Sequence, residues 1–530
     1  MPESEENPKS QSSGAQAGRG GLALAGGKIY FLVTGLVQQI ALKAILGLSG
    51  YGAYSTATSI ASIAYNPLIQ SGVQGVSREI AGATETAAPQ QLRSLLGFHA
   101  LVALGSSITF FFAADALTRW LGAPHLLLGL RWLSVILFLY GLYAPLIGFL
   151  NGRRRFLGQA GLDVLSATLR TLGLVGGAWA AARWLQGSDP LVYAGKQVEA
   201  TAIGFIIAAA LVVGAAFRLT GRGKPGGANF SWKTYGALVL RILFGQLMLN
   251  LLFQTDALLL RKFAAQAVFA GGQLPELADG YVGAYRASQL FCFLPFQLLT
   301  SVTFVLFPLL AAAKASGNRE EVARLVARGL RFATLVAGLI VSTIVSMPGG
   351  LLRVVFGVEV AVLGENSMPL LAVGMGFFAL LGVIASALNS LGHERRTLLV
   401  LTSAVVMVVV FCFVLAPQDS LSPLLLSRVA MATSLAMILT TLLAAQQLRM
   451  VAGAQVSLLS LGRTMLGVAL ASLVVTRVFP LAAETSRQAA ILPTIGGVIL
   501  SLFIFIGFLV VSRELKQEDA SQLRSLFSKK

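Results

Sequence analysis

The sequence is poor in charge: only 12% of its 530 residues are Asp, Glu, Lys or Arg, against 56% hydrophobic residues. The mean hydropathy is +0.77, far above that of a soluble globular domain. A pattern of short alternating strands is also missing, which argues against a transmembrane barrel. Apolar runs of about 20 residues recur along most of the chain, and each is long enough to cross a bilayer as a helix. The composition therefore predicts an all-α polytopic membrane protein.

Residues suited to catalysis or metal binding are scarce. The three histidines are too scattered to suggest a metal cluster, and both cysteines lie inside apolar runs without a partner at metal-ligand or redox spacing. No Walker loop or GxSxG motif is present. The longest loop, about residues 261 to 280, offers only Glu276 and Asp279 as catalytic carboxylates. We therefore expect a protein that is not an enzyme and that holds no metal or cofactor.

Acidic residues are outnumbered, 22 against 40 basic ones, which gives a formal net charge of +18. The basic residues lie between apolar runs and not in a soluble domain with interleaved aromatics, so a nucleic-acid partner is not expected. If the N-terminus is cytoplasmic, about 25 basic residues fall on the cytoplasmic side and about 8 on the other. This asymmetry predicts that both termini are cytoplasmic. A cleavable signal peptide is not expected, because the N-terminus is acidic and the first apolar run is too long.

Fourteen membrane spans are predicted from the apolar runs. They cover residues 22–46, 52–76, 94–114, 127–150, 160–182, 192–217, 235–260, 280–311, 332–352, 367–390, 397–416, 423–445, 464–480 and 489–511.

An internal repeat divides these spans into two halves. YGAYSTATS near the start of the second span resembles VGAYRASQL in the eighth, and GFLNGRRRF resembles ALNSLGHERR later in the chain. A shift of six spans keeps the same orientation, so the halves are expected to be parallel lobes with the substrate site between them. The predicted boundaries are a disordered cytoplasmic tail (1–20), an N-lobe (21–220), a C-lobe (221–450), an extra helix pair (451–512) and a second cytoplasmic tail (513–530).

Charged residues inside spans are the candidate binding residues, because an ionisable group in hydrocarbon is costly unless it faces a cavity or a partner. Arg170, Arg241, Arg286 and Lys28 are predicted to form a cationic cavity for an anionic headgroup. Arginine suits this role because its planar guanidinium can hold two phosphate oxygens at once.

The alternative is that these charges are paired or reach the membrane surface. Asp163 lies seven residues before Arg170 on the same helical face, and Asp256 is expected at the depth of Arg286. Lys28 is expected to reach the inner surface through its long side chain. Both interpretations remain open from the sequence.

Two carboxylates and two prolines complete the candidate residues. Asp256 and Glu199 are candidates for binding a coupling cation, either Na⁺ or a proton. Pro67 and Pro295 fall in the repeated spans, where proline removes one backbone hydrogen bond and bends the helix, so both are candidate hinges.

The segment YGAYSTATSIASIAYNPLIQSGVQGVSREIAG resembles the second-span signature of the polysaccharide-transport flippases, a family of the multidrug/oligosaccharidyl-lipid/polysaccharide (MOP) exporter superfamily. FQTDALLLRKF followed by VGAYRASQL is similar to the matching seventh-to-eighth junction, with Asp256 as its aspartate. The resemblance extends from about residue 20 to 512 and includes the fourteen spans.

This resemblance implies two lobes of six spans that work by alternating access in a bacterial inner membrane. It implies a flippase that carries an undecaprenyl-diphosphate-linked oligosaccharide from the cytoplasmic to the periplasmic leaflet for surface polysaccharide export, with polysaccharide polymerase or export proteins as further partners. A lipid II flippase and a multidrug or cation antiporter of the same superfamily are the alternatives. A non-transporting scaffold of a glycan-assembly complex is the alternative from a different class.

Overall fold

A computed structural model describes residues 8–184, 189–225, 230–417, 420–454, 457–482 and 484–515. It divides into two compact units, residues 1–254 and 255–530. Residues 1–7 and 516–530 of the predicted cytoplasmic tails lie outside the described residues, whereas residues 8–20 belong to α1, which begins at Pro8. The lobe boundary predicted at residue 220 stays a prediction.

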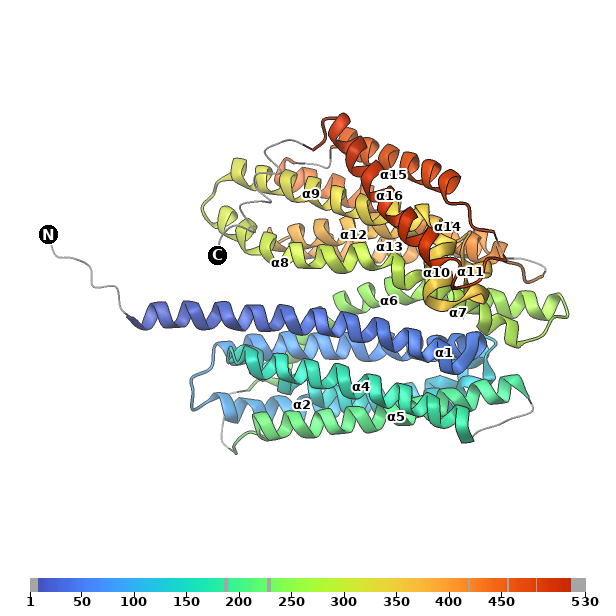
Figure 1. Ribbon diagram of the computed structural model, residues 1–530. Helices are drawn as coiled ribbons and strands as arrows, with labels where there is room; N and C mark the ends of the chain where they lie inside the picture. Colours follow the sequence, from blue (N-terminus) through green and yellow to red (C-terminus); the bar gives the residue numbers. More distant parts are fainter. Residues whose placement is uncertain are drawn as a thin grey trace. The chain divides into compact units, whose positions relative to one another are not determined.

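Unit 1 is a bundle of long helices that lie side by side (Figure 1). Its elements are α1 (Pro8–Ala81), α2 (Ala88–Trp120), the 3-10 helix η1 (Pro124–Leu126), α3 (Leu127–Gly152), α4 (Phe156–Trp184), α5 (Pro190–Thr220) and the first part of α6 (Trp232–Ala270). The most extensive contacts are those of α1 with α3 and of α4 with α5.

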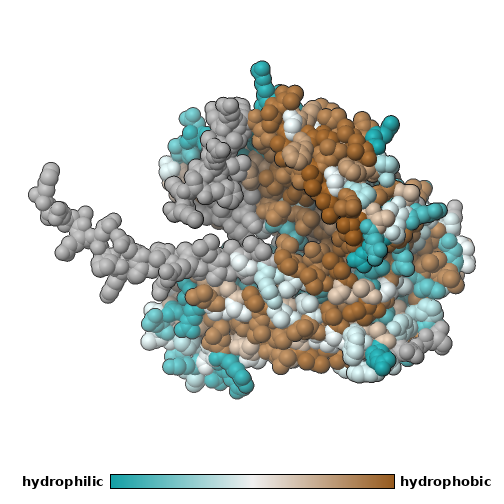
Figure 2. All heavy atoms as spheres, in the orientation of Figure 1, coloured by the Kyte–Doolittle hydropathy of each residue, from teal (hydrophilic) through white to brown (hydrophobic). Residues whose placement is uncertain are grey.

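Unit 2 contains the end of α6 and ten further helices in its described part. They are α7 (Glu276–Cys292), α8 (Leu294–Ala315), α9 (Arg319–Ser346), α10 (Pro348–Phe356), α11 (Val358–Gly364), α12 (Met368–Ser390), α13 (Glu394–Leu415), α14 (Leu424–Ala452), α15 (Leu458–Val478) and α16 (Ile491–Val511). The helix pair α15 and α16 packs on α9. Apolar side chains cover wide areas of the described surface, as expected for helices that face lipid (Figure 2).

Twelve helices in the described part of the chain are long and apolar enough to cross a membrane, two fewer than the fourteen predicted spans. One difference lies in α1, whose apolar part (residues 30–81) has 52 residues and would be about 78 Å long, more than twice the bilayer core. It contains the first two predicted spans, separated at Gly47, the one residue inside α1 with non-helical backbone angles (φ 73°). Gln197 of α5 donates a hydrogen bond to the carbonyl of Leu46 at this break (3.5 Å).

The eighth predicted span (280–311) corresponds to two helices, α7 and α8, which the structure separates at Phe293. Pro295 stands in the first turn of α8, where its missing N–H costs nothing. Pro67, in contrast, lies within α1, and the helix continues through it. The two prolines therefore differ in their structural setting, and their role as hinges stays a prediction.

The ninth span was predicted with the wrong end. It was placed at residues 332–352, whereas α9 ends at Ser346 and α10 starts at Pro348. Proline disfavours helical angles in the residue before it, and Met347 accordingly has φ −136° and ψ 50°. At its other end α9 begins at Arg319, because Asn318 caps it by accepting a hydrogen bond from the Glu321 amide (2.9 Å).

The contact between α4 and α5 positions the candidate site. A Cβ on Gly173 would lie 2.3 Å from the carbonyl oxygen of Gly204, so the two backbones approach each other directly. This close crossing brings Phe205 of α5 against Arg170 of α4, with the Arg170 guanidinium carbon 5.3 Å from the ring centre.

Candidate functional site

Arg170 lies near the middle of α4, surrounded by aromatic side chains of unit 1. The buried tyrosines Tyr54, Tyr65 and Tyr140 are its electrostatic neighbours, and the Tyr54 hydroxyl is within hydrogen-bonding reach of the guanidinium. The Phe205 ring closes a further side through a cation–π contact. The guanidinium is therefore shielded by aromatic groups, none of which carries a negative charge at neutral pH.

The charge of Arg170 has no carboxylate partner among the residues that the structure describes. Among the described residues no direct ion pair joins Arg170 to Asp163. The buried Nε of Arg170 also has no hydrogen-bond acceptor. The residue as a whole is half-buried, but an enclosed donor without an acceptor is costly, and an anionic ligand would offset that cost.

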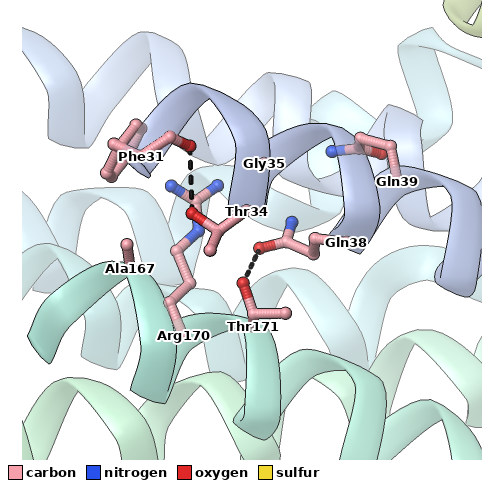
Figure 3. A pocket seen from close by; sticks show the side chains of 8 residues that line it. All are labelled: Phe31, Thr34, Gly35, Gln38, Gln39, Ala167, Arg170 and Thr171. Carbon is pink, nitrogen blue, oxygen red and sulfur yellow. Dashed lines mark hydrogen bonds between the residues drawn. The ribbon is translucent and has the colours of Figure 1, made fainter. Parts of the chain in front are cut away.

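A small pocket lies between α1 and α4 at this arginine (Figure 3). Its volume is about 90 Å³, and its lining residues are Phe31, Thr34, Gly35, Gln38, Gln39, Ala167, Arg170 and Thr171. Figure 3 shows Arg170 extending from α4 toward α1, with its guanidinium between Phe31 and Thr34. Apart from Arg170 the polar lining groups are uncharged amides and hydroxyls.

Gln38 is the most buried polar residue of this lining, at 3% exposure. Its Oε1 accepts a hydrogen bond from the Thr171 hydroxyl (3.4 Å), which joins α1 to α4. Nearby, the Tyr30 and Thr168 hydroxyls form a second hydrogen bond between these helices (2.8 Å). The two contacts hold the pocket walls together.

In unit 2, Asp256 and Arg286 belong to one hydrogen-bonded group. Asp256 Oδ2 accepts hydrogen bonds from the Tyr285 hydroxyl (2.8 Å) and from Gln289 Nε2 (2.7 Å), and Oδ1 accepts one from the Ala257 amide (2.8 Å). Arg286 donates to the side-chain oxygen of the same Gln289. Gln289 therefore bridges the two charges, a role that its sequence position did not indicate.

The repeated Gly-Ala-Tyr motif contacts the buried charge in each unit. Tyr54 lies at Arg170 in unit 1, and Tyr285 donates to Asp256 in unit 2. A hydroxyl can accept from a cation and donate to an anion, so the same residue type serves charges of opposite sign. The repeat thus places a half-buried cation in unit 1 and a buried anion in unit 2 beside equivalent tyrosines.

The remaining predicted residues are more dispersed. Arg241 on α6 is exposed, without a carboxylate partner among the described residues. Glu199 is half-buried on α5, with Lys196 as its charged neighbour. The side chain of Lys28 lies outside what the structure describes. Within the described residues, no group of three or more His, Cys, Asp or Glu side chains could hold a metal.

Two ion pairs in unit 2, one of them buried on both sides and one on the arginine side only, connect short segments. Arg261 Nε donates to Asp279 Oδ1 at 2.8 Å, and these side chains are only 2% and 0% exposed. Arg353, fully buried on α10, lies 3.7 Å from Glu365. Asp279, one of the two loop carboxylates considered as catalytic candidates, is therefore a structural partner of Arg261.

Glu514 joins three helices at the end of α16. Its carboxylate accepts hydrogen bonds from Ser460 (2.6 Å), Arg463 (3.0 Å) and Arg331 (3.4 Å), and its backbone carbonyl accepts another from Arg331. Burial alone would raise the pKa of Glu514, but the hydrogen bonds from Ser460, Arg463 and Arg331 outweigh it and lower that pKa below its ordinary value. Sequence reasoning missed this cluster, because its members lie far apart in the chain.

Comparison with known families gives one match, over residues 17–314, to the family described as Polysaccharide biosynthesis protein. No curated protein matches the sequence.

Several solved structures share the fold. The lipid II flippase MurJ in an inward closed conformation matches with a TM-score of 0.71 at 13% identity, over 92% of this chain and 100% of that chain. An inward-facing multidrug resistance MATE family transporter of the MOP superfamily matches with a TM-score of 0.60 at 15% identity, over 79% and 95%. A MOP superfamily transporter from Pyrococcus furiosus, described as having a binding pocket of reversed polarity, matches with a TM-score of 0.56 at 14% identity, over 81% and 94%. The chain therefore has the MOP superfamily fold.

Proposed function

The chain belongs to the Polysaccharide biosynthesis protein family, and from this premise we propose that it is a flippase for a lipid-linked oligosaccharide. The substrate is an oligosaccharide on undecaprenyl diphosphate, and the protein moves it from the cytoplasmic to the periplasmic leaflet by alternating access. The MOP superfamily fold supports a transport role, because all three solved structures described above carry transporter or flippase names.

The observation that carries this proposal is the uncompensated charge of Arg170. The residue is the fifteenth of the 29 in α4, so it lies near the middle of the helix, where transporters commonly bind their substrates. A diphosphate brings negative charge and several acceptor oxygens, and a guanidinium can bind two of these oxygens at once. A cationic drug would meet repulsion at the same place, which disfavours drug export through this pocket.

The scaffold alternative is disfavoured by the same residue. A purely structural protein gains nothing from a half-buried cation that has an enclosed, unpartnered Nε and no counter-charge, because such a group destabilises the fold unless it binds something. In unit 2, by contrast, a buried arginine with a structural role has a counter-charge, because Arg261 forms an ion pair with Asp279.

The other candidate residues are proposed to contact phosphate or to bind a coupling cation. Arg286, Arg241 and Lys28 are proposed as further phosphate contacts along the substrate path. For a coupling cation, Asp256 already accepts three hydrogen bonds, so a cation there would displace Tyr285 or Gln289. Glu199 is half-buried and needs no such rearrangement, which makes it the stronger of the two coupling candidates.

The cellular setting follows from the same proposal. We place the protein in a bacterial inner membrane with fourteen spans, counting α1 as two spans and α7 with α8 as one. Both termini then face the cytoplasm, and the two lobes move against each other during transport. Polysaccharide polymerase or export proteins are the proposed partners.

The experiment is a leaflet-translocation assay in proteoliposomes with a panel of lipids and an applied Na⁺ or proton gradient. We expect translocation of a fluorescent undecaprenyl-diphosphate oligosaccharide above the rate in protein-free liposomes, and no uptake of a cationic dye. Faster translocation of lipid II than of any oligosaccharide lipid would instead favour the lipid II flippase, the alternative supported by the match to MurJ. Dye uptake without lipid translocation would favour an antiporter.

A further inference from the structure

Besides Arg170, the pocket between α1 and α4 contains neutral polar side chains that can form hydrogen bonds with a ligand. Gln38 lines the pocket and is only 3% exposed. Its Oε1 accepts a hydrogen bond from Thr171, but its Nε2 donates none to the described residues. Its amide N–H groups therefore remain available on the pocket side. These N–H groups line a pocket that contains Arg170, so they can donate hydrogen bonds to a ligand held there.

The pocket contains one charged group next to several neutral polar groups. Arg170 supplies a positive charge with an unpartnered Nε, while Gln38, Gln39 and Thr171 supply neutral donors and acceptors beside it. A phosphate suits the guanidinium, because two guanidinium N–H groups can donate parallel, charge-assisted hydrogen bonds to two phosphate oxygens. A neutral polyol suits the amides and hydroxyls, because each hydroxyl can both donate and accept. Phe31 adds an apolar wall next to these polar groups.

The size of the pocket limits what it can hold. A volume of about 90 Å³ is well below the several hundred Å³ of a site that encloses a whole drug-sized ligand. An entire oligosaccharide cannot enter it. The pocket suits one small group and the nearest edge of the unit attached to that group.

We propose that this pocket is a subsite for a hexosyl phosphate, with the phosphate on Arg170 and the hydroxyls of the adjoining sugar on Gln38 and Thr171. In the cell this group is the phosphate and first sugar of the lipid-linked substrate, a step that rests on the proposed function. Recognition ends at the first sugar, and the remaining sugars lie outside the pocket. The subsite therefore tolerates glycans of different length.

The test measures binding to the purified full-length protein by saturation-transfer NMR titration. The probes are a set of hexose 1-phosphates, inorganic phosphate and the free hexoses. We expect at least one hexose 1-phosphate to bind more tightly than inorganic phosphate by about 3-fold or more, because the sugar adds hydrogen bonds. Equal affinities for all hexose 1-phosphates and inorganic phosphate would overturn the proposal and leave a phosphate pocket lined by ordered water.

Variants separate the two parts of the subsite. Gln38→Leu should weaken the hexose 1-phosphate about 3- to 10-fold and leave inorganic phosphate unchanged, whereas Arg170→Gln should weaken both by about 10-fold or more. Thr171→Val provides a second neutral variant should Gln38→Leu fold poorly. The matched controls are Gln159→Leu, about 16 Å along α4 from Arg170, and Thr118→Val, whose hydroxyl bonds only its own helix. Equal losses of both ligands in Gln38→Leu would contradict the assignment.

A second arm distinguishes the source of the ligand. A polyprenyl-phosphate hexose in nanodiscs should compete with the soluble hexose 1-phosphate, and Gln38→Leu should reduce this competition. Binding of the soluble probe without competition from the lipid would assign the pocket to a free sugar phosphate and refute its role in the flippase. Wild-type transport by Gln38→Leu, together with no probe binding, would refute the subsite while the flippase proposal stands.

Discussion

Replacing Glu514 by Gln should loosen the attachment of α15 and α16 to α9. The substitution keeps the shape of the side chain and removes its charge. Only 6% of Glu514 is exposed, so its hydrogen bonds act in a largely water-free environment. We expect the variant to unfold at a lower temperature than the wild-type protein at neutral pH.

The magnitude follows from the three donors. The Ser460 hydroxyl, 2.6 Å away, is buried, and its bond to an ionised carboxylate contributes about 1.5 kcal/mol. The side chains of Arg331 and Arg463 are 32% and 33% exposed, so solvent screening limits each ion pair to about 0.5 kcal/mol. Because Gln keeps part of the Ser460 interaction, the expected loss is about 2 kcal/mol.

The pH dependence provides a sharper version of this test. The folded-state pKa of Glu514 is depressed, so the carboxylate contributes stability above the unfolded-state pKa of about 4.3. That contribution is lost as the pH falls through the folded-state pKa. The difference between wild type and Glu514→Gln should therefore be constant near neutral pH and shrink in acid.

The assay is thermal unfolding of the full-length protein in detergent, followed by circular dichroism over a range of pH. Glu484→Gln is the matched control, because Glu484 is exposed and lies in the segment between α15 and α16. Identical unfolding temperatures for wild type and Glu514→Gln at neutral pH, or a difference that grows in acid, would refute the reasoning.

Two further substitutions test the fold. Asp279→Asn should destabilise unit 2 by about 3 to 5 kcal/mol in denaturant unfolding, because it leaves the buried guanidinium of Arg261 without its counter-charge, and the double variant Arg261→Met/Asp279→Leu should recover most of this loss. A double variant as unstable as Asp279→Asn would contradict this explanation. Gly47→Ala should cost about 1 kcal/mol or more, because its φ of 73° strains any side chain, whereas Gly97→Ala inside α2 should be neutral or stabilising.

Most of the long helices could be predicted from the sequence, because hydropathy separates apolar spans from their connections, whereas the short helices α10 and α11 were not predicted. The exceptions have local causes. The break at Met347 depends on Pro348, whose effect on its neighbour is invisible to a hydropathy window. The break within α1 depends on the positive φ of Gly47 (73°), which a hydropathy window also does not detect.

The candidate site was predicted only in part. Arg170 and Asp256 could be identified because a charge within an apolar run is conspicuous. Gln38 and Gln289 could not, because a neutral polar residue in a membrane helix gives no signal until the neighbouring helix is known. The Gln38 contact with Thr171 joins residues 133 positions apart, and only the packing of α1 on α4 brings them together.

The most direct measurement of the central claim compares two arginines of unit 1 in the proteoliposome assay. Arg170→Gln removes the pocket cation, whereas Arg131→Gln removes an arginine that also lies over an aromatic ring, Phe111 at 5.1 Å, but lines no part of the pocket. We predict that Arg170→Gln lowers translocation of the lipid-linked oligosaccharide at least about 10-fold while Arg131→Gln retains it. Equal rates for Arg170→Gln and wild type, with both proteins folded, would contradict the account.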